Sequence, residues 1–189
     1  MSALPDNPHV VLQTPRLPLL DSYEDALRRG WSPFAGQDAA AQELKKLLAD
    51  RAAYLASLNA QEGMMVLPDG RMKPRLPSRH FFISDGDFCG RINLRFQHRT
   101  TELPDYTSGH IGYAIVPWKQ GRGYATTALA AILPIARDVG LPFVVITCNS
   151  DNHASRRVIE KCGGVYTGIK PDLFQKDVLK LQFRIDLAR

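Results

Sequence analysis

A glycine-rich segment, QGRGYATTAL at residues 120–129, separates an apolar strand pattern from the pattern of an amphipathic helix. Glycine at the start of a helix costs conformational entropy, so its presence there requires a compensating gain. The usual gain is an exposed row of backbone N–H groups that can hold an anion at the positive end of the helix. The segment therefore predicts an anion site where a strand turns into a helix.

The order of the other periodic segments predicts an α/β fold, with one mixed sheet and helices on its faces. Helical periodicity covers 22–61, and two further helices are predicted at 123–139 and 152–161. One apolar stripe runs through the first region: Leu44, Leu47, Leu48, Ala52 and Leu55. Strands are expected at 10–17, 80–85, 88–96, 110–117, 143–148, 165–169 and 178–187, and a loop at 67–78. Pro134 should kink its helix near Ala130.

The composition is that of an ordinary soluble protein, and it argues against several functions. Apolar residues make up 44% of the 189 residues and charged residues 23%. The net charge of +5 suits a polyanionic small molecule, and without a zinc spacing or a helix-turn-helix signature no nucleic acid is expected. The longest apolar run, 128–136, is interrupted by Pro134 and is too short to cross a bilayer. Three cysteines without a CxxC pair, and an N-terminus without a secretory pattern, predict a reduced cytoplasmic protein.

The glycine segment fits one nucleotide or cofactor pattern better than two others. A dinucleotide fingerprint needs a third glycine where this chain has Thr126, and a Walker A loop needs a GK[ST] that is absent. The remaining pattern is Q-x-x-G-x-A, formed by Gln120, Gly123 and Ala125 at the start of the helix.

With the second motif, CNSDNHASRRVIEKCGG at 148–164, the chain resembles the cofactor core of the GNAT superfamily of N-acetyltransferases. That family has R or Q, two residues, Gly, one residue, and Gly or Ala in the loop, and often N-x-x-S before R-V-x-E-K in the next helix. The resemblance covers about 81–168, whereas about 20–65 shows only the family's general helical style. It implies a single domain over 1–189 with a mixed, mostly antiparallel sheet flanked by helices. It also implies acetyl-CoA as cosubstrate without a metal, and a primary amine of a small molecule, peptide or protein as acceptor; a homodimer is compatible with it.

The resemblance and the chemistry of coenzyme A together indicate the cofactor residues. The pyrophosphate needs several N–H donors converging on one spot, which a glycine turn into a helix supplies, and an arginine adds charge there. In the family the preceding strand opens a V against its parallel neighbour, and its N–H groups pair with the pantetheine. The expected cofactor-binding residues are Ile115, Val116, Gln120, Gly121, Arg122, Gly123, Tyr124, Ala125, Asn152 and Ser155. Asn152 would at the same time be the N-cap of the second helix, with Ser155 in its first turn.

The catalytic groups are less defined by the sequence. Many family members carry a tyrosine seven residues after the helix asparagine, which protonates the leaving thiolate, but this chain has Ile159 there. Solvent, Tyr113 or Tyr166 could replace it. His110, at the head of its strand, is the predicted general base because its ordinary pKa is near 6.5, with a surface histidine as the alternative. Carboxylates between Glu102 and Asp105 are further options.

Three functions remain open at this point. The leading prediction is an acetyl-CoA-dependent N-acetyltransferase. A non-catalytic acyl-CoA-binding module is the first alternative, which Ile159 in place of the tyrosine supports, and a nucleotide-binding protein is the second.

Overall fold

Seven strands form the central sheet, in the order β1-β4-β5-β6-β7-β9-β8. The computed structural model describes residues 9–32, 39–60, 63–67, 69–172, 175 and 177–187. The strands are β1 (Val11–Gln13), β4 (Ser78–Ser84), β5 (Phe88–Arg95), β6 (Ile111–Ile115), β7 (Phe143–Asn149), β8 (Val165–Pro171) and β9 (Leu179–Asp186). Neighbouring strands pair antiparallel except β6 and β7, which are parallel. The predicted mixed, mostly antiparallel sheet is confirmed.

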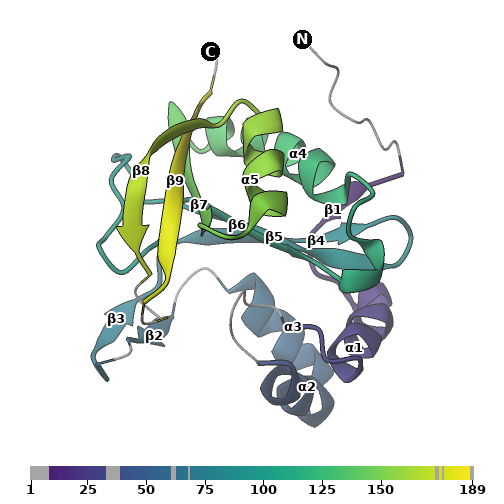
Figure 1. The fold of residues 1–189 in the computed structure, drawn as a ribbon. Helices are drawn as coiled ribbons and strands as arrows, with labels where there is room; N and C mark the ends of the chain where they lie inside the picture. The colour runs from purple at the N-terminus through teal and green to yellow at the C-terminus, as the bar shows by residue number, and fades with distance from the viewer. Residues whose placement is uncertain are drawn as a thin grey trace.

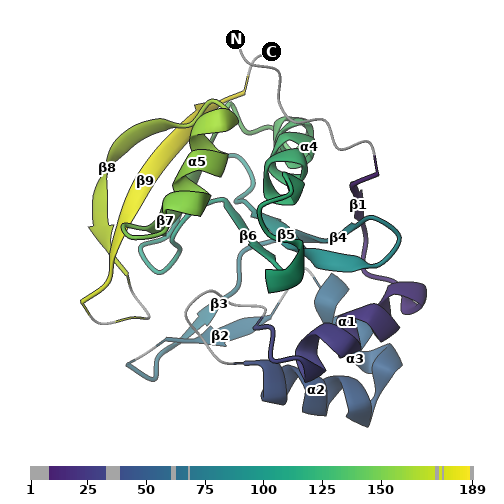
Figure 2. The ribbon, with the colours of Figure 1, turned by 45° about the vertical axis from the view of Figure 1, so that its right-hand side comes forward.

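Helices cover both faces of this sheet (Figures 1 and 2). On one face lie α4 (Tyr124–Asp138) and α5 (His153–Lys161). On the other lie α1 (Leu20–Arg28), α2 (Ala40–Ala49) and α3 (Arg51–Asn59). A hairpin of β2 (Met64–Val66) and β3 (Met72–Pro74) lies on the same side as α1–α3. None of the helices in the described part of the chain is long and apolar enough to cross a membrane.

The alternation of side chains along β5 and β6 separates two apolar layers. Ile92 and Ile115 belong to the layer between the sheet and the helices α4 and α5. Val116 belongs to the layer around α1–α3, and Ala114 packs against that layer. Since neighbouring residues of a strand point to opposite faces, each position of β6 is assigned to one side of the sheet.

The N-terminal third differs most from the sequence prediction. The strand expected at 10–17 is only Val11–Gln13, followed by a 3-10 helix at Leu17–Leu19, because Pro15 and Pro18 have no N–H to donate to a ladder. The helical region breaks at Asp50, whose side chain accepts a hydrogen bond from Ala53 N (2.9 Å) and so begins α3.

Two further predictions in this region need correction. The expected stripe is also narrower than predicted: Leu47 is fully buried, whereas Leu48, the next residue of α2, points about 100° away from it around the helix and is 52% exposed. The loop expected at 67–78 contains β3, which pairs with β2, because the turn between them is short enough for a hairpin. Gln61, the expected end of the helical region, lies outside the described residues.

The C-terminal half agrees with its prediction. Helix α5 begins at His153, with Asn152 as its N-cap, and α4 begins directly after Gly123. Pro134 lies inside α4, and the kink expected from it remains a prediction.

Candidate active site

The parallel strands β6 and β7 open away from each other like a V. Both strands lie within the described part of the chain, and Ile111 and Ile146 are the only residues that pair between them. Just before it, His110 N donates to Val145 O at 2.7 Å. Towards their C-terminal ends, β6 stays paired with β5 and β7 with β9. The helices α4 and α5 each follow one of these ends, so the N-termini of both helices lie at the opening, hereafter the β6/β7 opening.

The glycine turn before α4 has the conformation that an anion site needs. Gly121 and Gly123 have φ values of 75° and 84°, in the left-handed region. A Cβ on Gly121 would contact nothing within 4 Å, so this glycine is required for its backbone conformation rather than for space. The first N–H groups of α4 have no partner within the helix, and its first turn carries no acidic side chain. With the exposed Arg122 beside it, this turn is a positively polarised end of a 15-residue helix.

A partly buried ionic cluster, absent from the sequence prediction, fixes this turn to the sheet. The Asp85 carboxylate accepts hydrogen bonds from Lys119 Nζ at 2.6 and 2.8 Å and from the Tyr124 hydroxyl at 2.7 Å. Burial opposes ionisation of Asp85, but these hydrogen bonds outweigh it and lower its pKa below the ordinary value. The Tyr124 phenol is therefore engaged by the sheet, and only the backbone N–H of Tyr124 is left to face a ligand.

The two strand residues predicted to pair with the cofactor differ in what they offer. Val116 N donates to Cys89 O at 3.0 Å, so its N–H is engaged by β5, and the expectation that this N–H pairs with the cofactor is corrected. In an antiparallel ladder the N–H groups alternate, which turns the N–H of Ile115 away from β5 and towards the β6/β7 opening. Gln120 Nε2 donates to Ile115 O at 3.1 Å, which ties the side chain of Gln120 to the strand end.

The N-terminus of α5 is joined to β6 across the opening. Asn152 Oδ1 accepts the N–H of Ser155 at 2.9 Å, as expected of a capping residue. The Tyr113 hydroxyl lies 2.9 Å from Ser155 Oγ and donates to Ser155 O at 3.3 Å. Burial raises the pKa of Tyr113, so its phenol stays protonated through the neutral range.

The other tyrosine positions considered from the sequence do not reach the opening. Ile159 is fully buried in the apolar layer under α5. Tyr166 is 52% exposed on the edge strand β8, where its ring packs on Phe183. Tyr113 is therefore the phenol, of the two proposed as substitutes, that lies at the opening.

His110 does not have the environment predicted for a general base. Its side chain is 1% exposed, which also excludes the surface-histidine alternative. Its Nδ1 accepts the N–H of Val145 at 2.9 Å. Burial, followed by the charge of Arg95, lowers its pKa to about 4, so the ring is neutral and inside the protein at neutral pH. The structure thus gives His110 the role of joining β6 to β7.

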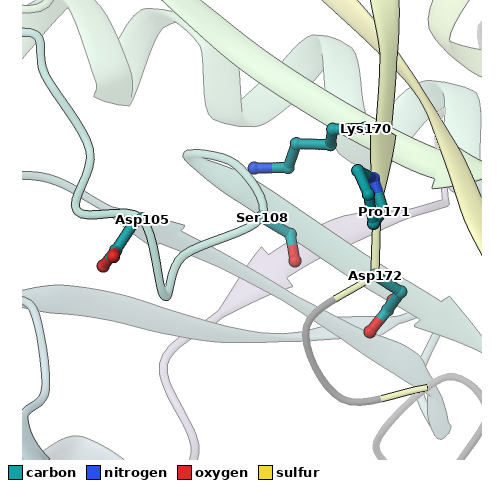
Figure 3. A pocket seen from close by; sticks show the side chains of 5 residues that line it. All are labelled: Asp105, Ser108, Lys170, Pro171 and Asp172. Atoms are coloured by element: carbon teal, nitrogen blue, oxygen red, sulfur yellow. The ribbon is translucent and has the colours of Figure 1, made fainter. Parts of the chain in front are cut away.

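The carboxylates proposed as alternatives lie in the connection between β5 and β6. Glu102 is exposed, and its backbone oxygen accepts a hydrogen bond from Gln97 Nε2 at 2.8 Å. Asp105 borders a cavity of about 260 Å³, shown in Figure 3, that is lined by Asp105, Ser108, Lys170, Pro171 and Asp172. Lys170 reaches from β8 towards this connection, where its Nζ donates to Thr107 O at 3.2 Å. This contact holds the connection against β8.

Other features of the described residues bear on cofactors. A second cavity lies between the C-terminal halves of α4 and α5, away from the helix N-termini. The described residues contain no group of three or more His, Cys, Asp or Glu side chains arranged to hold a metal ion. All three cysteines, Cys89, Cys148 and Cys162, are unpaired.

The comparisons with known proteins agree with the fold. Residues 24–165 match the family model described as an acetyltransferase (GNAT) domain. Similar solved structures include Mycobacterium smegmatis RimJ in complex with a CoA-disulfide, with 21% identity over 94% of this chain and 81% of that chain and a TM-score of 0.64. The ribosomal L7/L12 alpha-N-protein acetyltransferase RimL, in complex with coenzyme A, is 12% identical over 97% of both chains with a TM-score of 0.60. The microcin C7 self-immunity acetyltransferase MccE, in complex with acetyl-CoA and AMP, is 16% identical over 94% and 92% with a TM-score of 0.59. No curated protein matches the sequence.

Proposed function

The chain belongs to the GNAT acetyltransferase family, and we propose that it transfers the acetyl group of acetyl-CoA to a primary amine. The observation that carries the proposal is the β6/β7 opening, where the glycine turn before α4 and the inward N–H of Ile115 lie together. The complexes of RimL with coenzyme A and of MccE with acetyl-CoA support the choice of cosubstrate.

The glycine turn would hold the phosphates of the cosubstrate. The N–H groups from Gly121 to Ala125 and the positive end of α4 attract the pyrophosphate, and Arg122 adds a full charge. The Asp85–Lys119–Tyr124 cluster keeps this turn in place before a ligand arrives. A preorganised turn loses less conformational entropy on binding than a mobile one.

Two groups at the opening would support the chemistry. The amine attacks the thioester carbonyl, whose oxygen becomes negative, and the N–H of Ile115 is placed to stabilise that charge. The C–S bond then breaks, and the departing thiolate takes a proton from the Tyr113 phenol. Because His110 is buried and neutral, the acceptor ammonium loses its proton to solvent before the neutral amine attacks. The proton that the nitrogen loses after the attack also passes to solvent, and solvent returns a proton to the Tyr113 phenolate.

The acceptor is a primary amine of a small molecule, a peptide or a protein. RimL is named as a ribosomal L7/L12 alpha-N-protein acetyltransferase, which makes a protein N-terminus one candidate. The single domain over 1–189 and the cytoplasmic location remain proposals, the latter supported by three unpaired thiols. A homodimer also remains a proposal, supported by the edge strand β8, where Val165 and Ile169 are 68% and 56% exposed.

Release of the coenzyme A thiol tests the proposed activity. The protein is incubated with acetyl-CoA and a panel of small, peptide and protein amines, and the free thiol is measured against a reaction without amine. Amine-dependent release supports the transferase. A thermal shift with acetyl-CoA but no release with any amine would instead support the non-catalytic acyl-CoA-binding module, which Ile159 keeps as the second candidate.

A further inference from the structure

A row of polar side chains lies on the sheet face opposite α4 and α5. Along β5, the core residues Ile92 and Leu94 point towards α4 and α5. Their neighbours Arg91, Asn93 and Arg95 therefore point to the other face. That face also borders the β6/β7 opening, because β5 is the partner of β6.

Arg95 lies directly over β6. Its Nε donates to Gly109 O at 3.0 Å. A Cβ built on Gly112 would lie 3.3 Å from Arg95 Nη2 and 3.2 Å from Asn93 Oδ1, so the missing side chain of Gly112 leaves room for the guanidinium. Gly112 is three residues from Ile115, which corresponds to about 10 Å along a strand.

The charges around Arg95 are predominantly positive. Its pKa is lowered to about 10, first by burial and then by the charge of Arg91. His80, on the neighbouring strand, has its pKa lowered to about 4, first by burial and then by Arg91, Arg95 and Arg75. His80 is thus neutral and adds no charge of its own beside these arginines.

Two carboxylates act on neighbours of Arg95, Glu43 on Arg91 and Asp172 on Lys170, and both have other partners. Glu43 accepts hydrogen bonds from Lys46 and from the Tyr54 hydroxyl. Asp172 forms an ion pair with Lys180. Within the described ranges, no ion pair joins Arg95 to a carboxylate.

We propose that Arg95 binds a carboxylate of the acceptor, so that the preferred acceptors are primary amines with a carboxylate within about 10 Å of the amine. The proposal rests on the proposed function and deepens it by naming the acceptor class. A guanidinium binds a carboxylate through two parallel hydrogen bonds. A partly buried cation without a counter-ion is costly, and an acceptor carboxylate would remove part of that cost. A peptide N-terminus with an acidic second or third residue and a small acidic amine share this chemistry.

Calorimetric titration in the presence of saturating coenzyme A tests the proposal without requiring turnover. The ligands are the peptide amides Ala-Glu-Ala and Ala-Gln-Ala, which differ only in the charge of the central side chain. We expect the Glu peptide to bind at least about tenfold more tightly to the wild type. Arg95→Met should remove this preference, and Arg95→Lys should restore part of it.

Arg79→Met is the matched control. Arg79 is exposed on β4 opposite Leu94, which belongs to the α4 and α5 side, so its loss should leave the preference unchanged. Single-residue amides of Glu and Gln form a second pair of ligands. A preference in the peptides assigns a peptide acceptor, whereas a preference confined to the single residues assigns a small acidic amine.

Equal affinities of the wild type for the Glu and Gln ligands would overturn the proposal. A Glu preference that survives in Arg95→Met, in a variant that still shows the acetyl-CoA thermal shift, would also overturn it. A Glu preference without any thiol release has a different meaning. It would refute the transferase activity while leaving the carboxylate site supported.

Discussion

The Tyr113 hydroxyl lies 2.9 Å from the Oγ of Ser155, which joins β6 to the N-terminus of α5 across the β6/β7 opening. This pair places a phenol at the opening although the helix position used by many family members is occupied by the buried Ile159. Burial raises the pKa of the phenol, so it retains the proton that a departing thiolate needs.

Tyr113→Phe should therefore reduce kcat by about 100-fold, the lower end of the usual range for a lost general acid, with a smaller effect on KM. The measurement is steady-state thiol release at saturating acetyl-CoA. Tyr166→Phe is the control, because Tyr166 lies on the exposed edge strand, and its kcat should be unchanged. Wild-type kcat in Tyr113→Phe would show that solvent protonates the thiolate.

Gly123→Val should abolish the thermal shift produced by acetyl-CoA. Valine is disfavoured at φ 84°, and its adoption of another conformation would displace the N–H groups of the turn. For the wild type, ligand at 100 times Kd should add about 2.7 kcal/mol to the free energy of unfolding. Gly140→Val is the control, since Gly140 has φ 91° at the other end of α4. It should lose stability to a similar degree but keep the acetyl-CoA shift.

Asp85→Asn should lower the free energy of unfolding at pH 7 by about 2 kcal/mol, because charged hydrogen bonds from Lys119 and Tyr124 are weakened. The folded pKa of Asp85 is below its unfolded value near 3.9, so its contribution is present above that pH and is lost as pH falls through the folded pKa. Denaturant titrations of both proteins from pH 7 to pH 3 should show the difference shrinking in acid.

Asp69→Asn provides the comparison for Asp85. Its ion pair with Arg71 is exposed to solvent, and its removal should change stability little. An equal loss in the two variants would mean that the Asp85 cluster does not hold the glycine turn more firmly than a surface pair would.

His110→Asn should affect stability rather than the pH dependence of catalysis. The folded pKa of His110 is about 4 and the unfolded value is near 6.5, so the unfolded chain binds more protons between these values. Stability of the wild type relative to the variant should therefore rise as pH increases from 4 to 6.5 and stay level above that. The pH profile of kcat/KM should keep its shape in the variant. Loss of a limb near pH 6.5 would instead restore His110 as the base.

Local patterns were sufficient to predict the C-terminal half of the fold. The glycine turn, the helix N-cap at Asn152 and the apolar strand β7 each depend on residues that are neighbours in the sequence. Their conformations follow from backbone freedom, side-chain capping and periodicity, which a single sequence displays.

The rest depended on contacts between distant residues. Asp85 and Lys119 are 34 positions apart, and nothing in their spacing indicates that they meet. The sequence placed His110 at a strand end, but its burial follows from the packing of β7 beside it. From the sequence alone, Arg95 is an ordinary polar residue of a strand. Its position over β6 depends on the space that Gly112 leaves for the guanidinium, which only the structure shows.

The single parallel register between β6 and β7 also has a consequence for the order in which the sheet assembles. The strands β4, β5 and β6 pair antiparallel in sequence order, and β8 and β9 form a hairpin that adds to β7. The parallel pairing of Ile111 with Ile146 joins these two units, and it requires the crossover connection through α4 to be in place. Because loop closure must precede such non-local contacts, we expect the two units to form first and the β6–β7 pairing to form last. The V proposed to hold acetyl-CoA would then also be the place where the native sheet is completed.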